Sequence, residues 1–468
     1  MRIRFEPWRT AHPRVLTGAC LAAAAGLWAG AAAAQDPGGM RLILDIDNRV
    51  EVDSNSELLV DSPGTSIIGS TRLDFGLISE TRRQSLSFGG SVTARAFDIP
   101  TRDDNTDFDQ RELAFEYQRE AARAQLTLTG RYERADVERL TLADLIDDDE
   151  IDIDDPDFDE LRGRGTRETI GFGAAVEIGI DGPARLSLDA GYQERNYTED
   201  VDRDDSRRYD LGAETALRLT PVTEGTIGLA WLRVDEDDEA ETRRERFSLL
   251  FGITHDFSRT LTLNAALGPT WVSNREDGLT DRETGIDGDL GLSYERPTGT
   301  IDLDLTARTD EDGIRTGASI GRNFELPRGA LGGTIGLTRA ADGEINTTAT
   351  LDFRRDMPRG TFRARLARDV TPRFDESNVL RTVAQVDYDY AINNISDLGL
   401  NATFARNEET DGADRVDRID FGATYSRDLT TEWAMNVGYR FRARNDDDGD
   451  RNSHAVFVGI NRSFNFGI

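Results

Sequence analysis

Apolar and polar residues alternate along most of this chain, in stretches of about ten residues that are separated by polar connections. In one stretch, Leu86, Phe88 and Val92 alternate with Ser87 and Ser91. The same pattern recurs at 170–180, 261–267 and 398–404. Because successive side chains of a strand point to opposite faces, these stretches predict β-strands with one apolar and one polar face. No long stretch has the 3.6-residue period of an amphipathic helix, so the pattern predicts an all-β protein.

The alternation predicts about 22 strands, an even number that returns both ends of the chain to the same side of a sheet or barrel. Their predicted centres are Ile46, Leu73, Gly90, Ala114, Leu128, Ala174, Leu188, Ala213, Leu229, Leu249, Leu263, Leu290, Leu303, Ala318, Ile335, Ala349, Ala364, Ala384, Leu400, Phe421, Val437 and Val458.

The connections alternate in length along the chain. Short ones, rich in turn residues, follow even-numbered strands at 182–184, 297–299, 327–329, 358–360, 393–395 and 430–432. Longer, charged ones follow odd-numbered strands, for example at 235–243, 274–282, 408–415 and 445–454. Tight turns on one side and longer loops on the other are typical of a transmembrane barrel. The sequence therefore predicts a single large antiparallel transmembrane β-barrel.

Aromatic residues fall near the predicted strand ends, as the two interfaces of a bilayer favour. Odd strands end with Tyr132, Tyr192, Trp231, Trp271, Phe404, Tyr439 and Phe441, which we expect at the outer rim. Even strands end with Tyr117, Tyr294, Phe324, Phe353, Tyr388, Tyr425, Phe464 and Phe466, which we expect at the inner rim.

The first 34 residues are predicted to be a cleaved signal peptide, which leaves residues 35–468 for the barrel. Four arginines precede an Ala/Leu-rich run that ends at Ala32-Ala33-Ala34, a small-residue cleavage pattern. The only cysteine, Cys20, lies in this segment, so disulfides and thiolate chemistry are not expected in the mature chain.

The chain is strongly acidic, with a net charge of −32, and all 56 of its basic residues are arginine. Removing the signal segment takes away four arginines and Glu6, which leaves −35. A nucleic-acid partner is not expected, since phosphate binding needs a basic surface. We predict no cofactor.

One predicted outer loop, residues 136–166, is exceptionally acidic: Asp144–Glu160 carries eleven acidic residues in seventeen and no basic one. Such a segment could bind divalent cations and bridge them to anionic lipopolysaccharide. The alternative, which we favour, is a solvated loop that repels itself.

The polar faces of the predicted strands carry many charges, and these side chains are the candidate pore-lining residues. They are Asp287, Asp289, Asp302, Asp304, Arg354, Arg363, Arg365, Arg381, Asp387, Asp389, Arg418 and Asp420. Arginine facing lipid at mid-depth costs about 2–4 kcal/mol, so this face is expected to border a water-filled lumen. Cross-strand ion pairs that stiffen the wall are the alternative reading, and both can hold together.

Catalysis is not expected. The mature chain has two histidines, His255 and His454, which the strand assignment puts at opposite ends of the barrel wall. A hydrolase of the Ser-His or Asp-His kind therefore lacks a convincing base.

In its signal segment, Arg/Asp-rich walls and acidic loops, the chain resembles the porin-2-like β-barrel proteins of α-proteobacteria. The resemblance implies an outer-membrane location and a porin-like, water-filled channel for small hydrophilic solutes. Two alternatives are a conduit for exopolysaccharide, with periplasmic export partners, and a non-conducting structural protein. The expected partners are outer-membrane lipid, lipopolysaccharide and the barrel-assembly machinery, which would recognise the strand ending at 466–468. The first strand is expected near Met40, so no plug domain is predicted.

Overall fold

The structure, a computed structural model, describes residues 39–102, 106–137, 165–198, 201, 204–311, 313–372, 378–409, 415–447 and 449–467. The predicted signal peptide and all but the ends of the predicted acidic loop lie outside these residues.

Twenty-two strands make up the described chain. They are β1 (Met40–Asp53), β2 (Ser66–Glu80), β3 (Gln84–Asp98), β4 (Thr106–Ala121), β5 (Ala124–Asp136), β6 (Thr166–Ile178), β7 (Ala184–Tyr197), β8 (Ser206–Thr220), β9 (Thr223–Glu236), β10 (Arg243–Ser258), β11 (Leu261–Glu276), β12 (Leu279–Arg296), β13 (Gly299–Asp310), β14 (Gly313–Leu326), β15 (Gly329–Arg339), β16 (Ile345–Met357), β17 (Gly360–Pro372), β18 (Asn378–Asn393), β19 (Ser396–Glu409), β20 (Arg415–Asp428), β21 (Trp433–Asp446) and β22 (Gly449–Gly467). Each predicted strand centre lies within the corresponding strand, so the all-β class and the strand count are confirmed.

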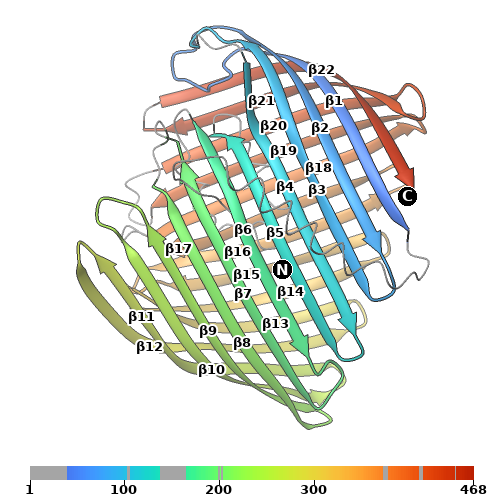
Figure 1. Ribbon diagram of the computed structural model, residues 1–468. Helices are drawn as coiled ribbons and strands as arrows, with labels where there is room; N and C mark the ends of the chain where they lie inside the picture. Colours follow the sequence, from blue (N-terminus) through green and yellow to red (C-terminus); the bar gives the residue numbers. More distant parts are fainter. Residues whose placement is uncertain are drawn as a thin grey trace, which may run out of the picture.

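The strands form one closed antiparallel barrel (Figure 1). Each strand pairs with the next in sequence, and β1 also pairs with β22, from Arg41 opposite Gly467 to Asp53 opposite Ala455. We name this β1–β22 junction the seam. Closure leaves no unpaired sheet edge, which a barrel needs in order to satisfy its backbone groups inside a bilayer. Among the described residues, none belongs to a helix with the length and apolarity needed to cross a membrane.

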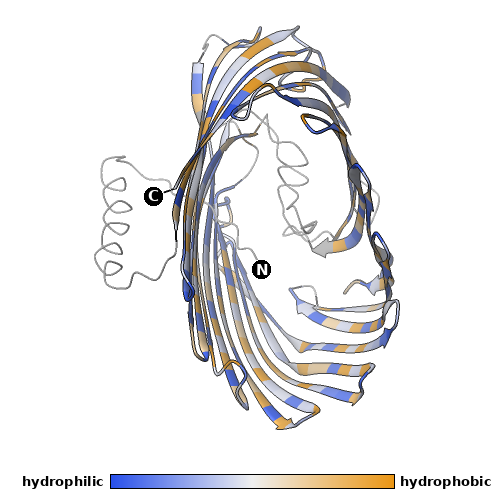
Figure 2. Cartoon of the chain, turned by 90° about the vertical axis from the view of Figure 1, so that its right-hand side faces the viewer, coloured by the Kyte–Doolittle hydropathy of each residue, from blue (hydrophilic) through white to orange (hydrophobic). Residues whose placement is uncertain are grey.

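Apolar and polar side chains take opposite faces of the wall, visible as alternating bands along the strands in Figure 2. On β12, Ile286 and Leu290 are 53% and 43% exposed, whereas Asp287 between them is 3% exposed. The polar face is the inner one, because it makes contacts across the concave side between strands that are not paired. Arg315 on β14, for example, donates to the carbonyl of Val370 on β17 over 2.9 Å.

Two pairs of aromatic rings lie toward opposite ends of the apolar band. Phe247 and Trp271 have ring centroids 5.7 Å apart, near the β11–β12 turn. Phe353 and Phe362 lie 5.9 Å apart near the β16–β17 turn, at the other end of the wall. Rings at these heights suit the two interfaces of a membrane.

Two of the predicted long loops are instead paired strand. The segment 274–282 continues β11 and β12 up to Glu276 opposite Leu279. Asp277 and Gly278 close this hairpin with φ of 50° and 77°, the backbone of a tight turn whose twist matches the strands. Similarly, 445–454 continues β21 and β22 up to Asp446 opposite Gly449. These hairpins extend beyond the apolar band, where both faces can be polar and the alternation that marks a strand disappears.

Candidate functional site

A polar cavity of about 390 Å³ lies on the inner face of the wall next to the seam. We name it the rim cavity. It is lined by Asp47, Arg49, Glu51, Asp53, Ser56, Ile68, Ser70, Arg72, Thr93, Arg95, Gln110, Ala135, Asp136, Arg440 and Arg442. These residues come from β1–β5, β21 and the β1–β2 connection, so the cavity combines strands from both ends of the chain.

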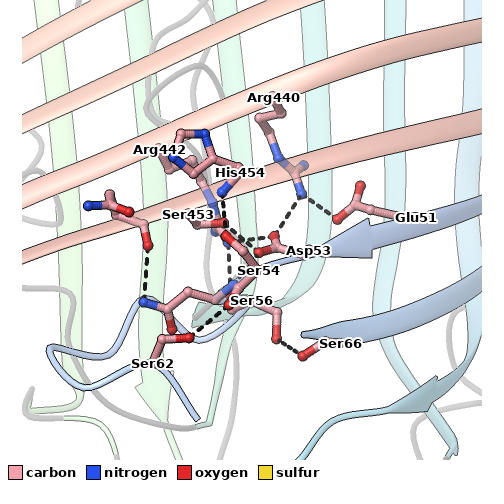
Figure 3. A network of polar contacts seen from close by, with 12 residues as sticks. Glu51, Asp53, Ser54, Ser56, Ser62, Ser66, Arg440, Arg442, Ser453 and His454 are labelled. Carbon is pink, nitrogen blue, oxygen red and sulfur yellow. Dashed lines mark hydrogen bonds and ion pairs between the residues drawn. The ribbon is translucent and has the colours of Figure 1, made fainter. Parts of the chain in front are cut away.

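Two arginines of β21 bind two carboxylates of β1 across the seam (Figure 3). Arg440 Nη2 donates to Glu51 Oε1 over 2.6 Å, and Arg442 Nη2 lies 3.4 Å from Asp53 Oδ2. Ser453 of β22 donates to Asp53 Oδ1. Asp53 is 0% exposed, so its charge depends on these partners. We name Glu51, Asp53, Arg440, Arg442 and Ser453 the seam cluster.

The β1–β2 connection is fastened to the inner wall by the same cluster. Arg442 Nη2 donates to the Ser56 carbonyl over 2.9 Å, and the Ser56 hydroxyl lies 2.9 Å from that of Ser66. Asn55 donates to the carbonyl of Asn452 on β22 over 3.1 Å. These bonds hold the connection across the seam, where it forms one side of the cavity.

The far side of the cavity depends on a β-bulge. The β3–β4 register shifts between Thr93 and Arg95, which turns Asp107 toward Arg95 at 3.6 Å. Arg95 also donates to Gln110 and lies 3.7 Å from Asp136. A bulge that re-aims a side chain in this way is common next to binding sites.

The predicted pore-lining residues all lie on the charged face of their strands, and the structure pairs many of them within the wall. Asp287 is buried and forms an ion pair with Arg246. Asp289 pairs with Arg308 at 2.6 Å. Asp302 accepts a hydrogen bond from Ser293 over 2.7 Å.

Most of the remaining predicted residues lie on β16–β20. Asp352 lies 3.6 Å from Arg365, while Arg354 pairs with Asp356 at 3.1 Å. On the paired strands β17 and β18, Arg363 lies opposite Asp387, Thr361 opposite Asp389, and Asp369 opposite Arg381. Arg418 of β20 lies opposite Arg444 of β21. Asp304 of β13 lies opposite Gly291 of β12. Asp420 faces Arg442, so it alone of the predicted set is in direct register with the seam cluster.

The cavity residues themselves were missed by the sequence reading. A signal for them exists: Asp45, Asp47, Arg49, Glu51 and Asp53 alternate on one face of β1. Arg440, Arg442 and Arg444 do the same on β21. Pairing these two series requires recognising that the barrel closes between the first and last strands.

The histidines occupy opposite ends of the wall. His255 Nδ1 lies 2.9 Å from the Thr223 hydroxyl, near the turns that follow even strands. His454 Nδ1 lies 2.8 Å from the Tyr439 hydroxyl, near the β21–β22 turn. Across the residues that the structure describes, no group of three or more His, Cys, Asp or Glu side chains is arranged to hold a metal ion.

No protein-family model and no curated protein sequence matches this chain. Solved structures do match. The FrpB iron transporter from Neisseria meningitidis is 12% identical, with a TM-score of 0.56 over 92% of this chain and 82% of that one. A variant of the ferric enterobactin receptor from Pseudomonas aeruginosa is 10% identical, with a TM-score of 0.53 over 92% and 82%. The siderophore receptor PirA from Pseudomonas aeruginosa is 12% identical, with a TM-score of 0.51 over 91% and 80%.

At these identities the likeness concerns the fold, and it defines the class: a 22-stranded β-barrel of the bacterial outer membrane. The expected membership in the porin-2-like family is wrong, and so is the porin-like diffusion channel, because the matching barrels are an iron transporter and siderophore receptors. Barrel size gives the physical reason. Open porins have 16–18 strands, whereas 22-stranded outer-membrane transporters have an occupied lumen. Neither the export conduit nor the structural role gains support from these structures.

Proposed function

We propose that the protein is an outer-membrane transporter that captures a small anionic iron chelate at the rim cavity and admits it into a lumen that is closed at rest. The observation that carries the proposal is the position of the rim cavity: a charged, inward-facing cavity at one end of a 22-stranded wall. The likeness to an iron transporter and to siderophore receptors supports the choice of cargo.

Charge at the cavity favours an anion. Its lining contains the five arginines Arg49, Arg72, Arg95, Arg440 and Arg442 against the four acids Asp47, Glu51, Asp53 and Asp136. The chain as a whole carries −32. Most of these arginines have carboxylate partners, but Arg49 has none among the described residues, so an anion can bind to it.

We also propose that the chain closes its own lumen without a separately folded plug. The β1–β2 connection, held by the seam cluster, is the described segment best placed to narrow the mouth of the barrel. The twelve charged residues predicted from the sequence would then line the path below it. The protein would act without catalysis, and the strand ending at Gly467 would serve recognition by the assembly machinery.

Uptake of radioactive iron tests the cargo. Cells lacking the gene should take up iron supplied as an anionic chelate more slowly than wild-type cells, and a plasmid copy should restore the rate. Unchanged uptake of every anionic chelate tried would overturn the proposed cargo.

Planar-bilayer recording of the purified protein tests the closed lumen. We expect no steady current through the resting protein. A large ohmic conductance at each insertion would show that the lumen is open.

A further inference from the structure

We infer that the rim cavity contains a subsite for a hydroxycarboxylate, in which Arg49 binds the carboxylate and Asp47 accepts a hydrogen bond from a hydroxyl of the ligand. Its part in transport rests on the proposed function, whereas binding itself rests on the geometry of the cavity.

Arg49 is the arginine of this cavity whose charge the described residues leave uncompensated. The other four have carboxylate partners: Arg72 with Asp74 at 2.7 Å, Arg95 with Asp107 at 3.6 Å, Arg440 with Glu51 at 2.6 Å and Arg442 with Asp53 at 3.4 Å. Arg49 instead lies over the ring of Phe457 on β22, with its guanidinium carbon 4.2 Å from the ring centroid.

Stacking fixes the orientation of this guanidinium. The ring occupies one planar face, so the N–H donors remain available along the edge. A carboxylate matches that edge with two parallel hydrogen bonds, which are stronger than neutral ones. An oriented, unpaired arginine is therefore a prepared anchor for a carboxylate.

Asp47 lies two positions before Arg49 on the same face of β1, about 7 Å along the strand. Among the described residues it has no hydrogen-bond or ion-pair partner. Its cross-strand neighbour is Arg72, whose Nε already donates to Asp74. A carboxylate accepts hydrogen bonds only, so it needs a donor from the ligand, and a hydroxyl provides one.

Thr93 gives independent evidence of an absent ligand group. Its side chain lines the cavity, the residue is 4% exposed, and Oγ1 has no hydrogen-bond partner in the described part of the chain. Nε of Arg440 is buried without a partner as well. Buried polar groups are almost always satisfied, so both atoms are available to oxygen atoms of a ligand that enters the cavity.

Together these groups select a ligand that carries a carboxylate and hydroxyls close to each other. A neutral polyol would leave Arg49 uncompensated, and a simple dicarboxylate would leave Asp47 without a donor. Leaving either one unpaired in the cavity weakens binding.

Titration calorimetry on the detergent-purified barrel tests the subsite with three matched probes: tartrate, succinate (the same dicarboxylate without hydroxyls) and erythritol (the hydroxyls without carboxylates). We expect tartrate to bind more tightly than succinate, and erythritol not to bind. Arg49→Gln should raise the Kd of tartrate at least about tenfold. Asp47→Ala should bring the affinities for tartrate and succinate close together.

Arg322→Gln is the control, because Arg322 also stacks at 4.2 Å on a ring, that of Phe324, but lies outside the cavity. It should leave tartrate binding unchanged. Heat-modifiable migration on gels confirms that each variant is folded.

Absence of tartrate binding to the wild type, equal binding of all three probes, or unchanged binding by Arg49→Gln would overturn the subsite. These failures differ from that of the proposed function. Gene-dependent chelate uptake without tartrate binding would refute only the hydroxycarboxylate subsite. Arg49-dependent tartrate binding without gene-dependent uptake would refute only the proposed transport of an iron chelate.

Discussion

Replacing Asp53 with alanine should destabilise the barrel more than removing a partly exposed carboxylate such as Asp74. Asp53 is fully buried at the end of β1. It accepts hydrogen bonds from Ser453 and from the backbone N–H of Asn55, and it lies 3.4 Å from Arg442. The substitution therefore removes the only acidic member of the seam cluster that contacts both β22 and the β1–β2 connection.

The expected loss of folding free energy depends on the environment of Arg442 after Asp53 is removed. Arg442 is 5% exposed and would retain its charge after its carboxylate partner is lost. Removing one partner of a buried ion pair costs about 3–5 kcal/mol when the other charge is left alone. Asp420 stays opposite Arg442 on β20, so we expect a loss nearer about 2–3 kcal/mol. Asp74→Ala breaks an ion pair of the same type, Arg72–Asp74, whose side chains are 41% and 34% exposed, and should cost under about 1 kcal/mol.

Urea titration of protein folded into lipid vesicles, followed by tryptophan fluorescence, measures both values. The double variant Asp53→Ala/Arg442→Met should be more stable than Asp53→Ala alone, since it also removes the buried guanidinium that has lost this carboxylate. If Asp53→Ala lowers the free energy of unfolding by no more than Asp74→Ala does, the seam cluster does not hold the barrel closed.

Two further substitutions test the wall. Gly268→Ala would place its Cβ 1.8 Å from the Leu249 carbonyl oxygen, so we expect more than about 3 kcal/mol of destabilisation or failure to fold. The Cβ of Gly228→Ala meets nothing within 4 Å, so this variant should keep the stability of the wild type within about 0.5 kcal/mol. Equal yields of heat-modifiable barrel from the two variants would contradict the close approach. Leu290→Arg, on the apolar outer face, should cost about 2–4 kcal/mol, whereas Thr306→Arg on the inner face of the next strand should cost under about 1 kcal/mol. Similar urea midpoints for these two would show that the outer face does not contact hydrocarbon.

The strand count could be predicted from the sequence because the two faces of the barrel wall contact different environments. Lipid on one face and polar groups on the other impose a period of two on every membrane-spanning segment. Beyond the membrane-spanning segments this alternation is lost, and there paired strands were predicted as loops. At 274–282 both faces are polar, so the composition of a paired hairpin resembles that of a loop, and only the Asp277-Gly278 turn indicates the pairing.

The cavity and the class of barrel were harder to predict. The alternation that reveals a barrel is the same whether its lumen is open or occupied, so it could not separate a porin from a receptor-like barrel. The seam cluster joins residues almost 400 positions apart; Glu51 and Arg440, for example, are separated by 389 positions in the sequence. The bulge that turns Asp107 toward Arg95 changes which face a residue takes, and a regular period cannot show it.

Many strands are longer than a bilayer requires. β12 has 18 residues, which at about 3.4 Å each and a tilt of about 45° gives about 43 Å of height, against an apolar band of about 25 Å. The surplus forms a collar of paired hairpins that stands clear of the hydrocarbon. Residues of this collar do not contact lipid, so their sequence can change without altering the membrane-spanning part of the wall. Such changes can alter what the collar recognises, and the turn at Asp277-Gly278 can accept an inserted epitope.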